Sequence, residues 1–254
     1  MIDIHCHVLP GVDDGAPDEA TALAMCRLAA ESGTTDLVAT PHANTQFAFS
    51  PEVNEQKRAR LQAALGESLR LYAGCDFHLT YDNMEAALAN RARFTINGGP
   101  YLLVEFSEQV IARSTSEIFS RLRGAGLTPI ITHPERNVQL QQHRSRLAAW
   151  VGRGCLIQVT GQSLLGRFGE QARKSAIALI NAGLVHVIAS DGHDLKNRPP
   201  VLSDSFQFVS YRWGERAARR LFVEHPRAVL DGAVIAVSDP GARRRKKKWW
   251  AFWR

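Results

Sequence analysis

The chain has 254 residues, of which 45% are hydrophobic and 22% charged, as in an ordinary globular protein with one barrel-sized domain. No apolar run approaches the ~20 residues of a membrane span, and no basic-then-apolar signal peptide is present, so we expect a cytoplasmic protein. The net charge of +6 belongs to the end of the chain, because residues 243–254 hold seven of the 31 Lys and Arg. The remaining 24 basic residues face 25 acidic ones, so no nucleic-acid-binding domain is expected.

The four cysteines also exclude several kinds of site. They are scattered along the chain, at Cys6, Cys26, Cys75 and Cys155. No pair has the Cys-x-x-Cys spacing of a thiolate zinc site, and the pattern does not indicate a disulfide framework. None is followed by Arg six positions later, so the phosphate loop of cysteine-dependent tyrosine phosphatases is missing.

Apolar, β-branched runs alternate with longer helix-like segments, which favours a parallel α/β architecture. The predicted strands are, in chain order, residues 2–5, 36–40, 71–76, 101–106, 128–132, 155–160 and 185–190. Apolar residues at helical spacing predict helices over residues 17–31, 54–71, 115–125 and 169–182. Seven such βα units fit a distorted, TIM-like barrel better than an open sheet, although periodicity alone does not decide between them.

Metal-ligating residue types lie at or just past the ends of these strands. His5 and His7 are one residue apart, so in an extended chain both imidazoles face the same side. In βα barrels the active site lies at the carboxyl ends of the strands, where such side chains meet. The candidate ligands are His5, His7, His42, Asp76, Glu105, His133, Asp191 and His193. The histidines without this placement are expected to be structural or solvated, and they are His78, His143, His186 and His225.

The eight candidate ligands supply N and O atoms and no thiolate, which suits Mn, Fe, Zn, Co or Mg. They exceed the need of one ion, so we expect two or three divalent ions. Neighbouring ions about 3.5–4 Å apart can activate water and stabilise the attacking and leaving oxygens of a phosphoryl group. A carboxylate such as Asp76 or Glu105 can bridge two ions, because each of its oxygens can serve a different one.

Two arginines and one aspartate are candidates for handling the phosphate itself. Arg136, in His133-Pro-Glu-Arg136, and Arg198, just after Asp191-Gly-His193, each offer a planar fork matched to phosphate oxygens. Asp14 could bind a metal or donate a proton to the leaving oxygen.

Taken in chain order, these residues resemble the PHP (polymerase and histidinol phosphatase) superfamily. They look most like its branch of bacterial metal-dependent protein tyrosine phosphatases linked to capsule and exopolysaccharide synthesis. The matching segments, spread over roughly residues 1–235, are Asp3-Ile-His-Cys-His7, Leu9-Pro-Gly-Val-Asp-Asp-Gly15, Ala39-Thr-Pro-His42, Leu103-Val-Glu105, Ile130-Ile-Thr-His-Pro-Glu-Arg136, Gln158-Val-Thr-Gly-Gln-Ser-Leu-Leu-Gly-Arg-Phe-Gly169 and Ala189-Ser-Asp-Gly-His193 with Arg198-Pro199-Pro200. His-Pro-Glu-Arg and Ser-Leu-x-Gly-x-Phe-Gly are the most branch-specific of them.

The resemblance implies a distorted (β/α)7 barrel, usually manganese as the metal, and the phosphotyrosines of a bacterial tyrosine autokinase as the substrate. It implies that the metal ligands are His5, His7, His42, Glu105, His133, Asp191 and His193, and that the catalytic or phosphate-binding residues are Asp14, Arg136 and Arg198. Two segments depart from the family. Gly74-Cys-Asp76 has Asp where Glu is typical, so its reach toward a metal is shorter, and residues 43–49 lack the usual Gly-x-Tyr, which bears on substrate preference.

We divide the chain into a phosphatase domain, residues 1–238, and a disordered basic and aromatic tail, residues 239–254. Cations together with Trp favour attachment to an anionic membrane surface, at the inner face of the membrane. A solvated tail that binds nothing specific is one alternative, and a tail that binds nucleic acid or acidic polysaccharide is another. Two alternatives to a protein tyrosine phosphatase also stay open: a phosphatase for a small phosphomonoester such as histidinol phosphate, and a catalytically weak membrane-associated scaffold. A homo-oligomer stays open as well.

Overall fold

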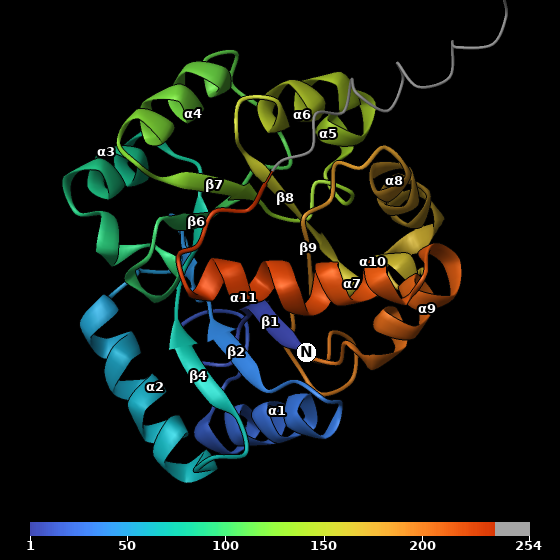
Figure 1. Cartoon of the computed structure of the whole chain (residues 1–254). Coiled ribbons are helices and arrows are strands. Elements are labelled where there is room, and N and C mark those ends of the chain that lie inside the picture. The colour runs from blue at the N-terminus through green and yellow to red at the C-terminus, as the bar shows by residue number, and fades with distance from the viewer. Residues whose placement is uncertain (237–254) are drawn as a thin grey trace, which may run out of the picture.

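The computed structural model describes residues 1–236, in which helices surround a curled parallel sheet (Figure 1). The strands are β1 (Ile2–Cys6), β2 (Asp36–Ala39), β3 (His42–Ala43), β4 (Arg70–Ala73), β5 (Asp76–His78), β6 (Tyr101–Glu105), β7 (Thr128–Ile131), β8 (Leu156–Thr160) and β9 (Val187–Ala189). The α-helices are α1 (Glu19–Glu31), α2 (Pro51–Leu65), α3 (Tyr81–Ala89), α4 (Thr115–Gly124), α5 (Val138–Gln142), α6 (Arg144–Val151), α7 (Gly161–Leu164), α8 (Gly169–Asn181), α9 (Ser203–Trp213), α10 (Glu215–Arg219) and α11 (His225–Leu230). Two 3-10 turns, η1 (Arg91–Arg93) and η2 (Ile96–Gly98), and the π-helical η3 (Arg220–Glu224) complete the described chain.

Two hydrogen-bonded sheets make up the wall of the molecule. One has the order β1-β2-β4 and the other β3-β5-β6-β7-β8-β9, and neighbouring strands run parallel in both. An isolated bridge joins Cys6 of β1 to Gly192, just after β9. The amide of Asp191 also donates to the His5 carbonyl at 2.8 Å. The wall therefore curls until its first and last strands in the chain meet.

The α/β class and the curled parallel sheet agree with the sequence prediction, while the strands differ in detail. The predicted strand 71–76 is divided into β4 and β5, and a short β3 follows β2. The two interruptions lie side by side, since Ala39 pairs with Ala73 before them and His42 with Asp76 after them. Pro41 lies in the first interruption and has no N–H to donate to the ladder. A regular count of seven βα units therefore stays a prediction. The predicted helix 54–71 was wrong at its end, because α2 stops at Leu65, before Gly66 with its φ of 60°.

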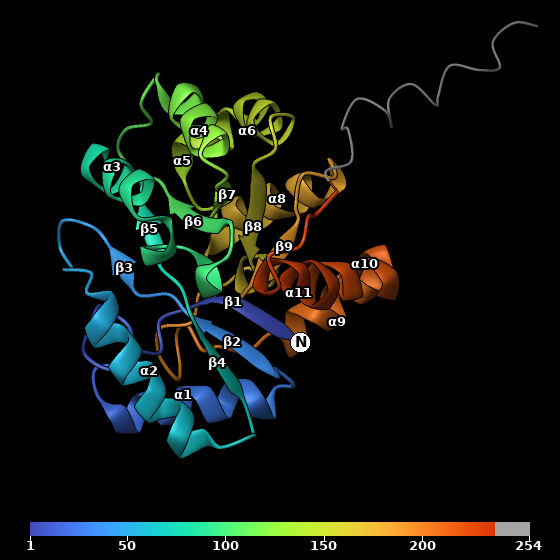
Figure 2. The same cartoon turned by 60° about the vertical axis from the view of Figure 1, so that its left-hand side comes forward.

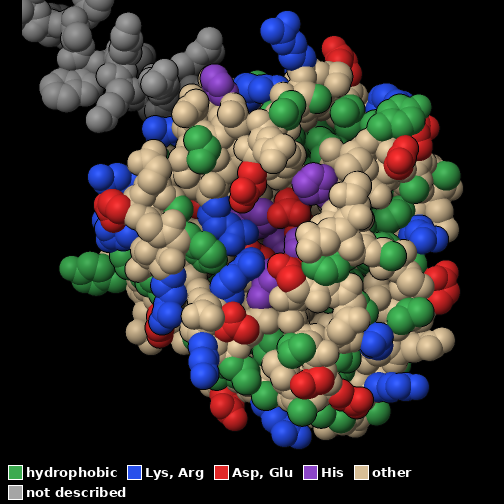
Figure 3. Space-filling view, turned by 180° about the vertical axis from the view of Figure 1, so that it is seen from behind, with side chains coloured by type: hydrophobic (Ala, Val, Ile, Leu, Met, Phe, Trp, Pro, Cys, Tyr) green, Lys and Arg blue, Asp and Glu red, His purple; other side chains and the backbone are tan. Residues whose placement is uncertain are grey.

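Apolar side chains fill both the interior of the curled sheet and the layer between sheet and helices. One buried cluster combines interior strand residues with two residues of α11, namely Ile4, Val38, Leu103, Ile130, Leu156, Val229 and Leu230. In Figure 1 α11 lies in front of the strands, beside the N-terminus, so it closes the amino-terminal end of the sheet. The view from behind looks onto the opposite, carboxyl end (Figure 3).

The outer helices are arranged around this wall. In both ribbon views α1 and α2 lie beside β1, β2 and β4, while α3 to α6 lie beside strands of the larger sheet (Figure 1, Figure 2). None of the helices within residues 1–236 has the length and apolar character needed to cross a membrane. The predicted tail, residues 239–254, lies outside the described residues.

Candidate metal centre

The eight predicted ligands meet in one hollow at the carboxyl ends of the strands. The strands β1, β3 and β5 carry His5, His42 and Asp76, and Glu105 is the last residue of β6. The remaining four follow β1, β7 or β9, and they are His7, His133, Asp191 and His193. In the space-filling view, histidine and acidic side chains gather in this hollow with basic side chains beside them (Figure 3).

Three overlapping groups of side chains could each hold a cation, because their ligand atoms lie within 4.8 Å of one another. The groups are His5, His7 and Asp76; His42, Asp76 and Glu105; and His7, Asp14, His42 and His193. Asp76 belongs to two of them, since its Oδ2 lies 3.5 Å from His5 Nε2 and 3.2 Å from His42 Nδ1. One carboxylate could thus bridge two ions, despite being a methylene shorter than Glu.

The chemistry of Asp76 tests whether these residues fit metal ions. Its side chain is fully buried, yet neither oxygen has a hydrogen-bond partner among the described residues. The Nδ1 atom of His42, 3.2 Å away, is also buried without one. Buried polar groups are nearly always paired, and leaving a carboxylate unpaired is costly. Divalent cations would satisfy both groups, so the donor set fits metal.

Hydrogen bonds on the far side of two histidines fix how they face the hollow. The carboxylate of Asp13 lies 2.7 Å from His7 Nδ1, and the Gln158 amide oxygen lies 3.2 Å from His5 Nδ1. Each oxygen accepts a hydrogen bond from Nδ1, so in the neutral ring Nε2 is the nitrogen that can ligate a metal. The two Nε2 atoms lie 3.3 Å apart. Asp13 and Gln158 therefore orient the histidines on β1 and just beyond it.

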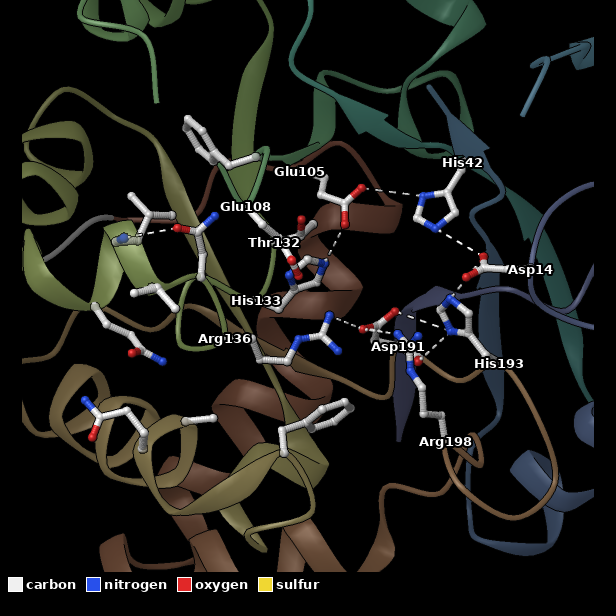
Figure 4. A pocket seen from close by; sticks show the side chains of 18 residues that line it. Asp14, His42, Glu105, Glu108, Thr132, His133, Arg136, Asp191, His193 and Arg198 are labelled. Carbon is white, nitrogen blue, oxygen red and sulfur yellow. Dashed lines mark hydrogen bonds and ion pairs between the residues drawn. The ribbon is translucent and has the colours of Figure 1, made fainter. Parts of the chain in front are cut away.

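Two arginines lie beside the histidines, and Asp191 contacts both groups. Its Oδ1 lies 3.5 Å from His5 Nε2 and 3.6 Å from His193 Nδ1. Its Oδ2 accepts a hydrogen bond from Arg136 Nη2 and another, at 2.7 Å, from Arg198 Nη2 (Figure 4). Both arginines line a cavity of about 520 Å³ together with Glu105, His133 and other residues of the hollow. The arrangement can hold cations and an anion side by side.

Comparison with known proteins identifies the family. The family described as "Capsular polysaccharide synthesis, CpsB/CapC" matches residues 1–231. The chain belongs to this CpsB/CapC family. It is 33% identical to the tyrosine-protein phosphatase YwqE of Bacillus subtilis (strain 168) over 97% of this chain and 98% of the relative. It is 29% identical to the tyrosine-protein phosphatase CpsB of Streptococcus pneumoniae, over 92% of this chain and all of the relative.

Solved structures agree with the family assignment. One, from work describing YwqE and CpsB as unique metal-dependent tyrosine phosphatases, matches with a TM-score of 0.89 at 32% identity and covers 94% of this chain and 98% of its own. A β-aspartyl dipeptidase of Fervidobacterium islandicum matches with a TM-score of 0.58 at 15% identity and covers 94% of this chain and 75% of its own, which shows a shared fold alone. The resemblance drawn from the sequence is confirmed.

Charges within this CpsB/CapC-family site shift the pKa values of its histidines strongly. Burial would lower the pKa of His5, but the carboxylates of Asp76 and Asp191 raise it to about 9. Burial would likewise lower the pKa of His42, but Asp14 and Asp76 raise it to about 11. Both rings are therefore doubly protonated and cationic at neutral pH when no ion is bound, and a metal cation must displace the second proton.

Two other histidines are held neutral instead. Burial and the nearby His7 lower the pKa of His193 to about 3. Burial and the Arg136 guanidinium hold the pKa of His133 well below its usual range. Neutral imidazoles can ligate a cation without first losing a proton.

Unusual backbone geometry marks the same end of the sheet. His133 and Asp191 have φ values of 32° and 51°, in the left-handed region that non-glycine residues rarely adopt. Gly15 lies so close to His7 that an added Cβ would be 2.1 Å from the His7 carbonyl oxygen. The glycine that ends the Leu9–Gly15 segment is therefore required by the approach of that loop to a candidate ligand.

The structure brings every predicted site residue to this hollow, and Asp14, Arg136 and Arg198 line its cavity. It also places beside the histidines two residues to which the sequence analysis gave no role. Asp13 and Gln158 orient histidines, as described above. His78, expected to be structural or solvated, has its Nδ1 3.6 Å from Glu105 Oε2. Only Asp13 had a sequence signal, as a neighbour of Asp14 in the same motif.

Proposed function

We propose that this chain is a metal-dependent protein tyrosine phosphatase. It would hydrolyse phosphotyrosine on a bacterial tyrosine autokinase and so regulate capsule or exopolysaccharide synthesis. The single observation that carries the proposal is the position of Asp191, which contacts the histidine cluster through one oxygen and two arginines through the other. A phosphate ester placed there would meet cations on one side and guanidinium forks on the other. The family membership and the names of the relatives agree with this chemistry.

The metal ligands in this proposal are His5, His7, His42, Asp76, Glu105, His133, Asp191 and His193. They would hold two or three divalent ions, manganese first among them. Bound ions supply activation of a water molecule and neutralisation of phosphate charge. Asp13 and Gln158 accept hydrogen bonds from the Nδ1 atoms of two ligands and so direct their Nε2 atoms to the metal.

The arginines would bind the phosphate oxygens. Arg136 and Arg198 each have one Nη2 on Asp191, and their planar forks leave further N–H groups for the substrate. Asp14 belongs to a ligand group with His7, His42 and His193. A hydrogen bond from His42 holds the pKa of Asp14 well below its usual range. An ionised Asp14 suits metal ligation better than proton donation.

The proposal is tested with purified protein, MnCl₂ and three substrates: a phosphotyrosine peptide, a phosphoserine peptide and histidinol phosphate. We expect preferential release of phosphate from the phosphotyrosine peptide, loss of activity with a chelator, and recovery with added Mn²⁺. His133→Ala should abolish turnover, while the matched variant His143→Ala, at an exposed position outside the hollow, should retain it.

Three results would count against the proposal. Preference for histidinol phosphate would assign the chain to small phosphomonoesters. Turnover that survives both chelation and His133→Ala would reject the metal mechanism. Absence of turnover on all three substrates with Mn²⁺ would favour the scaffold alternative.

We also propose that the phosphatase domain ends near residue 238 and that the remainder attaches it to the inner face of the membrane. The support is composition: residues 243–254 combine seven cations with Trp249, Trp250, Phe252 and Trp253. Each cation near an anionic leaflet contributes about 1 kcal/mol, and Trp prefers the headgroup region. Co-sedimentation with phosphatidylserine vesicles should be strong for the full chain and weak for a form ending at Gly241. Equal pelleting would contradict membrane attachment, and sedimentation velocity of the same samples tests for a homo-oligomer.

A further inference from the structure

Phe168 forms one wall of the cavity that the arginines share. It lies between α7 and α8 in the Ser163–Gly169 segment and is half-buried. The guanidinium carbon of Arg136 lies 4.5 Å from the centre of the Phe168 ring, and that of Arg198 lies 5.9 Å from it. One aromatic ring therefore contacts both candidate phosphate-binding cations.

The ring completes a set of restraints on the two guanidinium groups. Asp191 Oδ2 accepts one N–H from each arginine, which fixes a single corner of each fork. A planar cation held at one corner can still rotate about it, and contact with a ring face limits that rotation. Asp191 and Phe168 together therefore restrain both guanidinium groups.

The segment that carries Phe168 is tied to the chain neighbours of both arginines. Glu135, next to Arg136, is fully buried and accepts hydrogen bonds from Ser163 Oγ at 2.7 Å and from the Thr160 amide at 3.0 Å. Gln162 donates to the carbonyl oxygen of Pro199, next to Arg198, at 2.9 Å. These bonds link the turn that precedes Phe168 to the chain neighbours of both arginines.

We propose that Phe168 is a positioning residue that holds Arg136 and Arg198 as a pair for the phosphoryl group. This inference rests on the proposed phosphatase function and adds a residue to which no role was assigned. The ring touches the arginines rather than the phosphate, so it acts through them. Its removal weakens binding of any phosphate group, whether or not that group carries an aromatic ring.

Inorganic phosphate is the probe that separates this role from stacking on a tyrosine ring. We expect Phe168→Leu, in the full chain loaded with Mn²⁺, to bind phosphate about 10-fold more weakly by isothermal titration calorimetry. The KM for a phosphotyrosine peptide should rise by a similar factor. Phe168→Trp, which restores an aromatic face, should recover most of the loss.

The matched control is Phe208→Leu. The ring of Phe208 lies 6.0 Å from the guanidinium carbon of Arg173, and neither residue lines the cavity. This variant loses an aromatic contact with an arginine and should bind phosphate like the wild type. Melting curves of all variants test whether a loss of folding causes any change in phosphate affinity.

Each remaining outcome overturns the inference. The inference fails if a folded Phe168→Leu protein binds phosphate with wild-type affinity. If the KM for the peptide is raised in that same protein, the ring contacts the substrate instead of positioning the arginines. Equal weakening in Phe168→Leu and Phe168→Trp would exclude the aromatic face as the cause. A wild-type protein that neither binds phosphate nor hydrolyses the peptide would overturn the proposed function as well, and so the two failures are distinguishable.

Discussion

Two fully buried carboxylates lie at opposite ends of the sheet, and their surroundings differ sharply. Asp36, at the amino-terminal end of β2, accepts hydrogen bonds from Arg70, Arg227, Tyr72 and Thr35, at 2.7 to 3.0 Å. Asp76, at the carboxyl end, has no hydrogen-bond partner on either oxygen among the described residues. Its nearest charged neighbours are two imidazoles, at 3.2 and 3.5 Å.

The difference distinguishes a carboxylate that stabilises the fold, Asp36, from one that is left for a ligand, Asp76. At the amino end, the cations that pair with Asp36 come from β4 and α11, so the carboxylate joins three elements. At the carboxyl end, carboxylates and imidazoles lie close together, and Asp76 has no hydrogen-bond donor among them. A buried carboxylate without donors costs free energy unless a cation arrives. We infer that metal, rather than the protein, completes the second site.

The largest effect is expected from Asp76→Asn. Removing the one carboxylate shared by two ligand groups should lower Mn²⁺ affinity and phosphatase activity at least about 100-fold. Mn²⁺ at 100 times its Kd should stabilise the wild type by about 2.7 kcal/mol, and this increment should vanish in the variant. Calorimetric titration with Mn²⁺ and thermal melting with and without the ion measure both.

The metal-free Asp76→Asn protein provides the control. Its melting temperature should fall less than that of Asp36→Asn, because the charged imidazoles of His5 and His42 lose an opposite charge but no hydrogen bond, whereas Asp36 accepts hydrogen bonds from four residues. A large drop in the absence of metal would mean that Asp76 stabilises the fold through His5 and His42. The contrast with Asp36 would then fail.

A smaller effect is expected from Asp13→Asn. The carboxylate of Asp13 fixes the tautomer of His7 from 2.7 Å but lies in none of the ligand groups. Losing such an orienting partner typically costs 10- to 100-fold in metal affinity or activity. The matched control Asp18→Asn changes an exposed carboxylate that caps α1 and should leave Mn²⁺ affinity unaltered. Equal Mn²⁺ affinity in Asp13→Asn and the wild type would remove Asp13 from the site.

The sequence could single out candidate ligands because few residue types bind metal and parallel strands bring their carboxyl ends together. The structure places these residues in one hollow, and their binding of metal stays a prediction. His5, His7, Asp191 and His193 follow short apolar runs that could be recognised without a structure. The choice between Asp13 and Asp14 could not be made in this way. They are adjacent residues of one type, and the positive φ of Gly11 and the close approach of the loop at Gly15 decide which faces which histidine.

Other contacts at the two ends of the sheet arise only in three dimensions. His78 lies near Glu105 because β5 extends to residue 78, beyond the predicted strand end. Gln158 is a neutral amide in a buried strand and becomes an orienting group only because β8 lies opposite His5. Arg227, which pairs with Asp36, is 191 residues away along the chain. No local pattern encodes such a pairing.

Asp36→Asn is expected to have the smallest effect on the metal centre, and it should also lower the stability of the fold. Burial would raise the pKa of Asp36, but hydrogen bonds from Arg70, Thr35 and Arg227 hold it well below its ordinary value. Because the folded-state pKa is depressed, the carboxylate stabilises the protein above its ordinary pKa of about 3.9, and this contribution is lost as the pH falls below that value. We expect the variant to lose about 1.5 kcal/mol at pH 7.

Urea denaturation from pH 7 down to pH 3.5 measures this loss. The difference between wild type and Asp36→Asn should shrink as the pH drops below about 4, while Mn²⁺ affinity at pH 7 stays that of the wild type. A difference that persists at low pH would mean that the variant disturbs packing rather than charge. A fall in Mn²⁺ affinity would mean that the two ends of the sheet are coupled, and the amino end could no longer be treated as a purely structural counterpart of the metal centre.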